Sequence, residues 1–343
     1  MPLPRSASRA PWPGGQPGGR ARPSAGRLLP LAAAIVVVAA LTVAGALGAY
    51  RYLDTYWLYR GFPSPSQPRS VLVHRHGAAH RVPVEPASVH RLTLTTRALG
   101  GFPDTVYVVL PPGYASHPQQ RYPVLYLLHG NPGEPDNFLT VGRVQIIESA
   151  LQAAGNIKPM ILVMPTGGRS FFNNGQWANG VGAGNQWETF VARDLVGTID
   201  HKYRAITSRG GRGIAGLSEG GYGSLNIGLH NPAEFGLLES WSGYMWADAA
   251  RIFGWNPSLE DYNSPASYVP HVAGQLRSDH TYLWFYCGTD DYLRKQDRYF
   301  SAELSSLGVA HEFFEHHGGH SWALWRTLMP ASLIEASEHL SHG

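Results

Sequence analysis

The sequence contains a single cysteine, Cys287, in 343 residues. No disulfide can therefore form within the chain, and the apolar run around Cys287 favours a small buried side chain over a reactive thiol. The zinc-protease motif H-E-x-x-H is also missing, although four histidines, including His316 and His317, fall between residues 311 and 320. The alternating pattern there would turn neighbouring side chains to opposite faces of a strand. We therefore expect no metal site and no cofactor.

Acidic residues are missing from residues 1–27, which hold five arginines and many prolines and glycines. The whole chain has a formal net charge of +3, so the part after residue 27 carries −2. The high isoelectric point is therefore due to residues 1–27 and not to the rest of the chain. The composition of these residues predicts a disordered, basic, cytoplasmic tail. The remainder offers no basic surface of the kind that binds nucleic acid, so we expect no nucleic-acid partner.

Charges of either sign are missing from residues 28–50, which are rich in alanine, valine and leucine. A stretch of this length can cross a bilayer as a helix, and the arginine-rich flank would stay in the cytoplasm. We expect an uncleaved signal anchor in the cell membrane, with the catalytic domain outside. The alternative is a signal peptide cleaved near Ala44-Gly45-Ala46 and a secreted protein. Residues 51–88, broken by prolines, are expected to be a spacer with one edge strand at 71–73.

The domain expected over residues 89–343 alternates apolar runs with helical segments. Strands are predicted at 91–96, 105–110, 123–128, 159–165, 213–216, 282–287 and 311–316, and helices at 187–203 and 219–230. The first two strands resemble an antiparallel pair. The alternation that follows predicts an α/β fold with a mostly parallel central sheet and helices on both faces.

A candidate nucleophile stands where one of these strands runs into a helix. Residues 216–220 read Gly-Leu-Ser-Glu-Gly, which matches G-x-S-x-G in the strand–turn–helix context of a nucleophile elbow. Such a turn is tight, and Gly216 and Gly220 leave room for it. Ser218 is therefore the predicted nucleophile, and it requires a base and a residue that orients the base.

Two later segments supply candidates in the chain order Ser, Asp, His. The strand at 282–287 ends in Gly288-Thr289-Asp290-Asp291, and we favour Asp291 as the acid, with Asp290 as the alternative. The last strand leads into a glycine-flanked loop that carries His320, the predicted general base and acid.

A third loop offers an oxyanion hole. The strand at 123–128 opens into His129-Gly130-Asn131-Pro132-Gly133. Acyl transfer needs two N–H donors where negative charge develops on the carbonyl oxygen. The backbone N–H groups of Asn131 and Glu219 are the candidates.

These motifs resemble the esterase D family of α/β-hydrolases, which includes S-formylglutathione hydrolases, feruloyl esterases and mycolyltransferases. The matching segments are 122–130, 214–223 and 319–322, and the resemblance covers about residues 91–320. It implies an α/β-hydrolase fold and a serine hydrolase. In the mycolyltransferases the acid is a glutamate further downstream, so Glu303 is an outside alternative to Asp291. The family commonly has methionine after the nucleophile, where this chain has Glu219.

The sequence therefore predicts an exported serine carboxylic-ester hydrolase acting on lipid or cell-envelope esters. The alternatives are an acyltransferase that uses the same acyl-enzyme and, less favoured, a non-catalytic envelope-binding module. The segments 166–186 and 242–281, rich in glycine, asparagine and aromatic residues, are expected to wall the substrate site. Glu219, Glu134 and Asp136 would suit a substrate with a cationic group, such as an aminoacyl ester.

Overall fold

The structure is a computed structural model of the chain, and it describes residues 28–52, 66–75, 78–170, 173–247 and 250–342. The expected basic tail (1–27) and part of the expected spacer (53–65) lie outside the described residues. The chain separates into two units, residues 1–58 and 59–343. In the first unit the described part is one helix, α1 (Leu28–Tyr52).

Helix α1 covers the charge-free stretch where we expected a membrane-spanning signal anchor. Within the described part of the chain, no helix combines the length and the apolar character that crossing a membrane requires. The expected transmembrane helix is therefore not supported.

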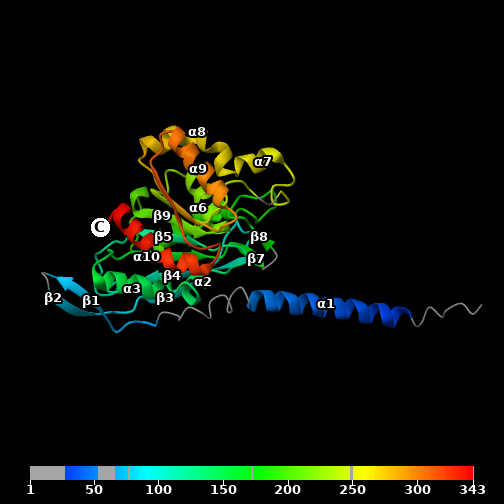
Figure 1. Cartoon of the computed structure of the whole chain (residues 1–343), viewed down its shortest axis with the longest axis horizontal. Helices are drawn as coiled ribbons and strands as arrows, with labels where there is room; N and C mark the ends of the chain where they lie inside the picture. The colour runs from blue at the N-terminus through cyan, green and yellow to red at the C-terminus, as the bar shows by residue number, and fades with distance from the viewer. Residues whose placement is uncertain (1–27, 53–65, 76–77, 171–172, 248–249, 343) are drawn as a thin grey trace, which may run out of the picture. The chain divides into compact units, whose positions relative to one another are not determined.

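The second unit is built on one eight-stranded sheet with the order β12-β11-β10-β9-β5-β6-β4-β3 (Figure 1). The strands from β12 to β6 pair in parallel, whereas β4 pairs antiparallel with both β6 and β3. The predicted mostly parallel sheet with an antiparallel pair at its start is confirmed. The strands are β3 (Ser88–Thr95), β4 (Pro103–Leu110), β5 (Val124–Leu128), β6 (Ile161–Pro165), β9 (Arg212–Leu217), β10 (Leu237–Trp241), β11 (Tyr282–Gly288) and β12 (His311–His316).

Helices cover both faces of this sheet (Figure 1). Successive side chains of a strand point to opposite faces. Val124, Tyr126 and Leu128 accordingly join one buried cluster with α6, α8 and α9, while Leu125 and Leu127 join a second cluster with α2, α3 and α10. The helices are α2 (Asn137–Thr140), α3 (Val144–Ala154), α6 (Glu219–His230), α7 (Pro257–Tyr262), α8 (Pro265–Ser278), α9 (Arg294–Ser306) and α10 (Trp322–His339).

The helix expected at 187–203 is divided in three. A short α4 (Trp187–Thr189) leads into a π-helical segment, η3 (Phe190–Leu195), and then into α5 (Val196–Lys202). A π-helical turn holds an extra residue per hydrogen-bonded ring, and apolar periodicity alone does not reveal it. The 3₁₀ turn η4 (Arg209–Gly211) follows before β9.

Two small hairpins lie outside the main sheet. The single edge strand expected at 71–73 is instead a hairpin of β1 (Ser70–Arg75) and β2 (Ala78–Pro83). The chain then reaches the domain at Ala87, whose N–H donates to Ser149 on α3 over 3.0 Å. The other hairpin pairs β7 (Gly168–Ser170) with β8 (Asn173–Asn174).

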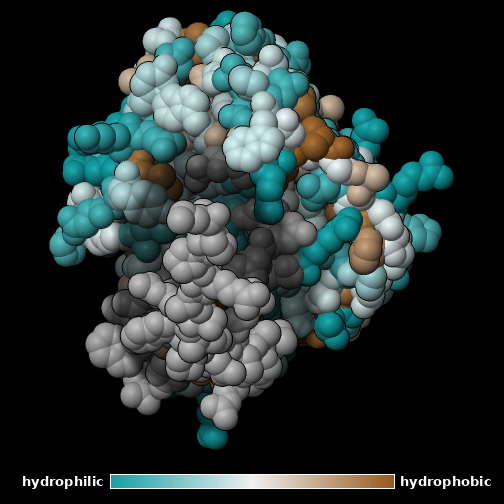
Figure 2. Space-filling view, turned by 90° about the vertical axis from the view of Figure 1, so that its right-hand side faces the viewer, coloured by the Kyte–Doolittle hydropathy of each residue, from teal (hydrophilic) through white to brown (hydrophobic). Residues whose placement is uncertain are grey.

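The sheet is buried between its helices. Cys287 in β11 is fully buried, as predicted, and burial raises the pKa of its thiol. Among the described residues on the face shown in Figure 2, hydrophilic side chains predominate and hydrophobic ones form small scattered groups. Since β5, β9, β10, β11 and β12 are parallel, their carboxyl ends meet at one edge of the sheet. All the predicted catalytic segments follow these ends.

Candidate active site

Ser218 occupies a strained turn between β9 and α6. Its φ of 55° and ψ of −119° lie where side-chain-bearing residues are rare. Its N–H donates to the Trp241 carbonyl over 2.8 Å, which ties the turn to the end of β10. A methyl group on Gly220 would lie 1.9 Å from the Leu128 carbonyl oxygen, and one on Gly216 would lie 2.3 Å from that of Gly220. Both positions thus require glycine.

A chain of hydrogen bonds runs from this serine to a buried carboxylate. The distance from Ser218 Oγ to His320 Nε2 is 2.8 Å, and that from His320 Nδ1 to Asp291 Oδ2 is 3.0 Å. The second oxygen of Asp291 accepts from the Leu293 N–H over 2.9 Å. Because a carboxylate only accepts, Nδ1 carries the proton and Nε2 is left to accept from the serine.

Asp291 is held ionised by its surroundings. Its side chain is fully buried. Burial alone would raise the pKa of Asp291, but the hydrogen bond and charge of His320, together with the Leu293 N–H and Ser242, bring it below the ordinary value. The orienting group therefore stays negative at neutral pH.

The alternative acids lie elsewhere. The Asp290 side chain is exposed, and its N–H donates to the Gly318 carbonyl over 2.9 Å. Glu303 lies on α9, and the side-chain hydrogen bonds of His320 in the described structure go to Ser218 and Asp291. Of the three candidates, the structure brings Asp291 to the histidine.

Three residues that sequence reasoning missed support the histidine. The His320 ring meets Trp325 edge to face at 5.0 Å and lies 4.9 Å from the ring of Tyr292. The Trp325 indole N–H donates to Ser242 Oγ over 3.2 Å. Ser242 follows β10, so its position at a strand end was the one available signal.

The predicted oxyanion loop is held by His129, whose role was also missed. Its Nδ1 lies 2.9 Å from the Gly130 carbonyl, and its Nε2 accepts from the Gly167 N–H over 2.9 Å. Burial lowers the pKa of His129 to about 4, so the ring is neutral with its proton on Nδ1. The Trp177 N–H donates to the His129 carbonyl over 3.1 Å. Asn131 follows this fixed turn.

A cavity of about 610 Å³ opens beside the serine. Ser218 lines it together with Asn131 and Glu219, whose N–H groups are the predicted oxyanion donors. Gln176 comes from the segment 166–186 and Trp246 from 242–281, so both expected loops contribute to its wall. The cavity is large enough for a small ester.

A comparison with known proteins identifies the family. A family model described as "putative esterase" matches residues 101–336. The chain belongs to this esterase family. The resemblance inferred from the motifs is thereby confirmed, and the α/β-hydrolase-like fold agrees with it.

Several known proteins are similar to this chain over long stretches of its domain. Esterase Rv1288 of Mycobacterium tuberculosis (strain ATCC 25618 / H37Rv) is 31% identical over 287 residues, which cover 71% of this chain and 60% of that protein. The chain thus spans less than two thirds of the length of that relative. A solved ferulic acid esterase superposes with a TM-score of 0.68 at 28% identity, covering 75% of this chain and all of the other. The diacylglycerol acyltransferase/mycolyltransferase Ag85B of Mycobacterium leprae (strain TN) is 26% identical over 183 residues, 46% of this chain and 51% of that protein.

The four histidines between residues 311 and 320 have separate contacts: His320 bonds to Ser218 and Asp291, and His311 bonds to Ser301 on α9. The ring Nδ1 of His316 lies 3.0 Å from the carbonyl of His317. The part of the chain that the structure describes holds no group of three or more His, Cys, Asp or Glu side chains arranged to bind a metal.

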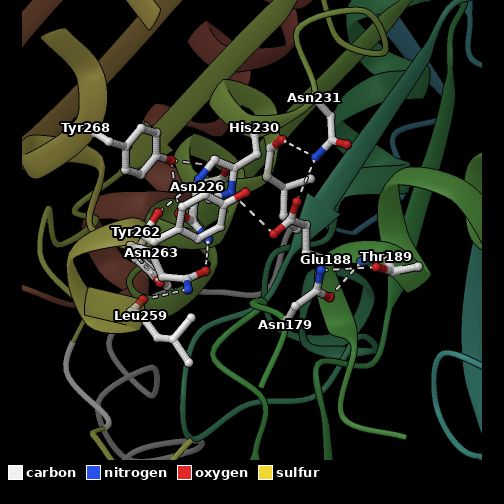
Figure 3. Close-up of polar contacts among 12 residues, drawn as sticks. Asn179, Glu188, Thr189, Asn226, His230, Asn231, Leu259, Tyr262, Asn263 and Tyr268 are labelled. Carbon is white, nitrogen blue, oxygen red and sulfur yellow. Dashed lines mark hydrogen bonds and ion pairs between the residues drawn. The ribbon is translucent and has the colours of Figure 1, made fainter. Parts of the chain in front are cut away.

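A second polar network lies at the far end of α6 (Figure 3). Glu188 accepts from Asn231 over 3.1 Å and lies 3.3 Å from Nδ1 of His230. The His230 ring stacks on both Tyr262 and Tyr268, with ring centroids 4.4 and 4.5 Å away. These contacts fasten the segment after residue 250 to the nucleophile helix.

The network reaches the catalytic cavity through two stacked tyrosines, Tyr222 and Tyr244. Asn226 on α6 donates to Asn263 over 3.2 Å, and the Tyr222 hydroxyl donates to the Asn263 carbonyl over 2.7 Å. Tyr222 stacks on Tyr244 at 4.5 Å, and Tyr244 lines the cavity. The segment 242–281 is therefore fixed against α6 on the cavity side as well.

Proposed function

We propose that the chain is a serine carboxylic-ester hydrolase that works through an acyl-enzyme. The observation that carries the proposal is the hydrogen-bonded series Ser218, His320, Asp291 beside the cavity. Membership of the esterase family and likeness to a ferulic acid esterase support it.

The reaction follows from the geometry of the proposed triad. Ser218 Oγ attacks the ester carbonyl while His320 Nε2 takes its proton. His320 then gives that proton to the leaving alcohol, and the same base activates water to release the acid. Asp291 fixes the tautomer of His320 and stabilises the imidazolium. The N–H groups of Asn131 and Glu219 hold the oxyanion, where one donor is typically worth about 3–4 kcal/mol.

Reaction with a fluorophosphonate tests this proposal. The intact mass of the full-length protein is measured after treatment, with Ser218→Ala alongside. We expect one label per chain in the wild type and none in the variant. A folded wild-type protein that takes no label would overturn the triad and favour the non-catalytic binding module.

Acyl transfer is the second candidate, and similarity to the mycolyltransferase Ag85B supports it. A sugar or lipid hydroxyl would then intercept the acyl-enzyme in place of water. Product analysis in the presence of an added alcohol separates the two, because a transferase forms the new ester while a hydrolase releases the acid. Esters of lipids or of the cell envelope are the proposed substrates for either activity.

Export of the catalytic domain also belongs to the proposal. It rests on the arginine-rich residues 1–27 and the charge-free stretch 28–50, a pattern typical of export signals. Protease treatment of intact cells checks it. An exported domain is degraded while a cytoplasmic control protein survives, and a fully protected domain would contradict export.

A further inference from the structure

The ring of His230 faces a hydrogen-bond acceptor at each of its two nitrogens (Figure 3). Nε2 lies 3.0 Å from the Tyr262 carbonyl oxygen, and Nδ1 lies 3.3 Å from Oε2 of Glu188. The other oxygen of Glu188 accepts from Asn231 over 3.1 Å, which fixes the carboxyl group in place. A carbonyl oxygen can only accept a hydrogen bond, and an ionised carboxylate can only accept as well.

The two contacts of the ring therefore require one proton more than a neutral histidine beside an ionised glutamate holds. A neutral imidazole donates through one nitrogen, so the other contact would set two lone pairs face to face. Either His230 carries a proton on both nitrogens or Glu188 keeps its own, and the pair holds the same number of protons in both states. Solvent has little access to the pair, since 7% of the His230 side chain and 11% of the Glu188 side chain are exposed.

The titratable groups that contact the ring from the described elements packed against it are Glu188 of α4, Tyr262 of α7 and Tyr268 of α8. Burial raises the pKa of both tyrosine hydroxyls above the ordinary value, and it does the same for Tyr222 further along α6. The tyrosines therefore stay neutral over the pH range in which histidines titrate. The pair of His230 and Glu188 is the part of this network that can gain or lose a proton there.

The corner between α7 and α8, which the His230 ring contacts, also holds the wall of the catalytic cavity. Trp246 lines this cavity, and both of its neighbours in the chain are hydrogen-bonded to the corner. The Ala247 N–H donates to Ser264 Oγ over 2.9 Å, and the Met245 carbonyl accepts from the Ala266 N–H over 3.1 Å. A displacement of the corner would therefore move Trp246.

We infer that His230 and Glu188 are positioning residues for the substrate cavity, and that the proton they share keeps Trp246 in the place where the ester binds. When this proton is lost at alkaline pH, one contact of the ring breaks and the corner loosens. Asn263 still ties the corner to α6, so the protein stays folded while ester binding weakens. The inference rests on the proposed ester hydrolysis and adds a pH dependence of binding to it.

The competing explanation is that the pair only stabilises the fold. A substitution would then change KM by the same factor at every pH.

Glu188→Gln separates the two explanations, because it makes the same contacts with a proton that does not titrate. Its amide oxygen can accept from Asn231 while its N–H donates to Nδ1 of a neutral His230. His230→Gln is a second variant, which removes the titrating ring itself. Glu338→Gln is the matched control, since it makes the same chemical change at an exposed residue of α10.

The KM for p-nitrophenyl acetate is measured on the full-length proteins from about pH 6 to about pH 9.5, a range that spans the ordinary histidine pKa and stays below that of tyrosine. The rate of Ser218→Ala is subtracted as background. The wild-type KM is divided by that of Glu188→Gln at each pH, so that the titration of the catalytic histidine cancels.

We expect this ratio to be near one at the lowest pH and to rise at least about threefold at the highest, the size of one lost hydrogen bond. The ratio of wild type to His230→Gln should rise by a similar factor from a lower starting value, because that variant binds the ester less well at every pH. The KM of Glu338→Gln should follow that of the wild type.

A ratio of wild type to Glu188→Gln that stays constant with pH overturns the inference and leaves ester hydrolysis intact. If Glu188→Gln does not fold, the comparison with His230→Gln decides in the same way. A wild-type KM that is constant over the whole range overturns the inference without any variant. Failure of the wild type to hydrolyse any ester or to take a fluorophosphonate overturns it together with the proposed function.

Discussion

Replacing Asp291 by asparagine should abolish most activity without removing the nucleophile. In the wild type, Asp291 Oδ2 accepts the Nδ1 proton of His320 over 3.0 Å, and this leaves Nε2 free to accept from Ser218. An asparagine amide can donate to Nδ1 instead. The ring would then carry its proton on Nε2, where it cannot accept the serine proton.

The expected loss is about 10⁴-fold in kcat, or about 5 kcal/mol of transition-state stabilisation. The matched control is Asp290→Asn, since Asp290 is exposed and its side chain has no hydrogen bond to His320. We expect that variant to stay within about twofold of the wild type, as surface changes usually do.

Steady-state hydrolysis of p-nitrophenyl acetate measures both variants, and circular dichroism verifies that they fold. Comparable losses in the two variants would refute the assignment of the acid. So would a folded Asp291→Asn that keeps more than about a tenth of the wild-type kcat, because the tautomer argument would then be wrong.

Three further predictions concern the groups around the site. Burial lowers the pKa of His129 to about 4, so the stability it contributes is present above about pH 6.5 and is lost, by about 3 kcal/mol, as the pH falls toward 4. His129→Gln should make the melting temperature less dependent on pH over that range. If the melting temperature of the variant changed with pH as steeply as that of the wild type, the argument would be contradicted. Burial raises the pKa of Glu239 to about 8, so its contribution is present below about pH 4.5 and about 4 kcal/mol is lost as the pH rises to 8. Glu239→Gln keeps an acceptor for Ser332 and Trp241, and should therefore melt above the wild type at pH 8 but not at pH 5. Trp177→Phe leaves the buried His129 carbonyl without that donor, which should cost about 1–3 kcal/mol in thermal or urea unfolding and lower kcat more than it changes KM. If the variant were as stable as the wild type, the hydrogen bond from Trp177 to the His129 carbonyl would contribute nothing to the free energy of unfolding.

The elements that the sequence predicted well have local causes. Ser218 could be singled out because Gly216 and Gly220 are needed wherever a strand turns sharply into a helix, whatever surrounds them. The buried strands were recognisable because both faces of a covered parallel sheet demand apolar side chains. Expectations about residues 51–88 and 187–203 were less accurate, since a hairpin and a π-helical segment depend on contacts rather than on periodicity.

The sequence by itself determined the α/β architecture, the esterase family and the order of the candidate serine, acid and histidine, because each is encoded in short segments. Only the tertiary structure shows which of Asp290 and Asp291 meets His320, since adjacent side chains point in different directions and Asp291 is the one hydrogen-bonded to the ring. It also placed Glu219 in the cavity lining. Which side chains meet is set by the strand order that brings distant loops to one edge of the sheet.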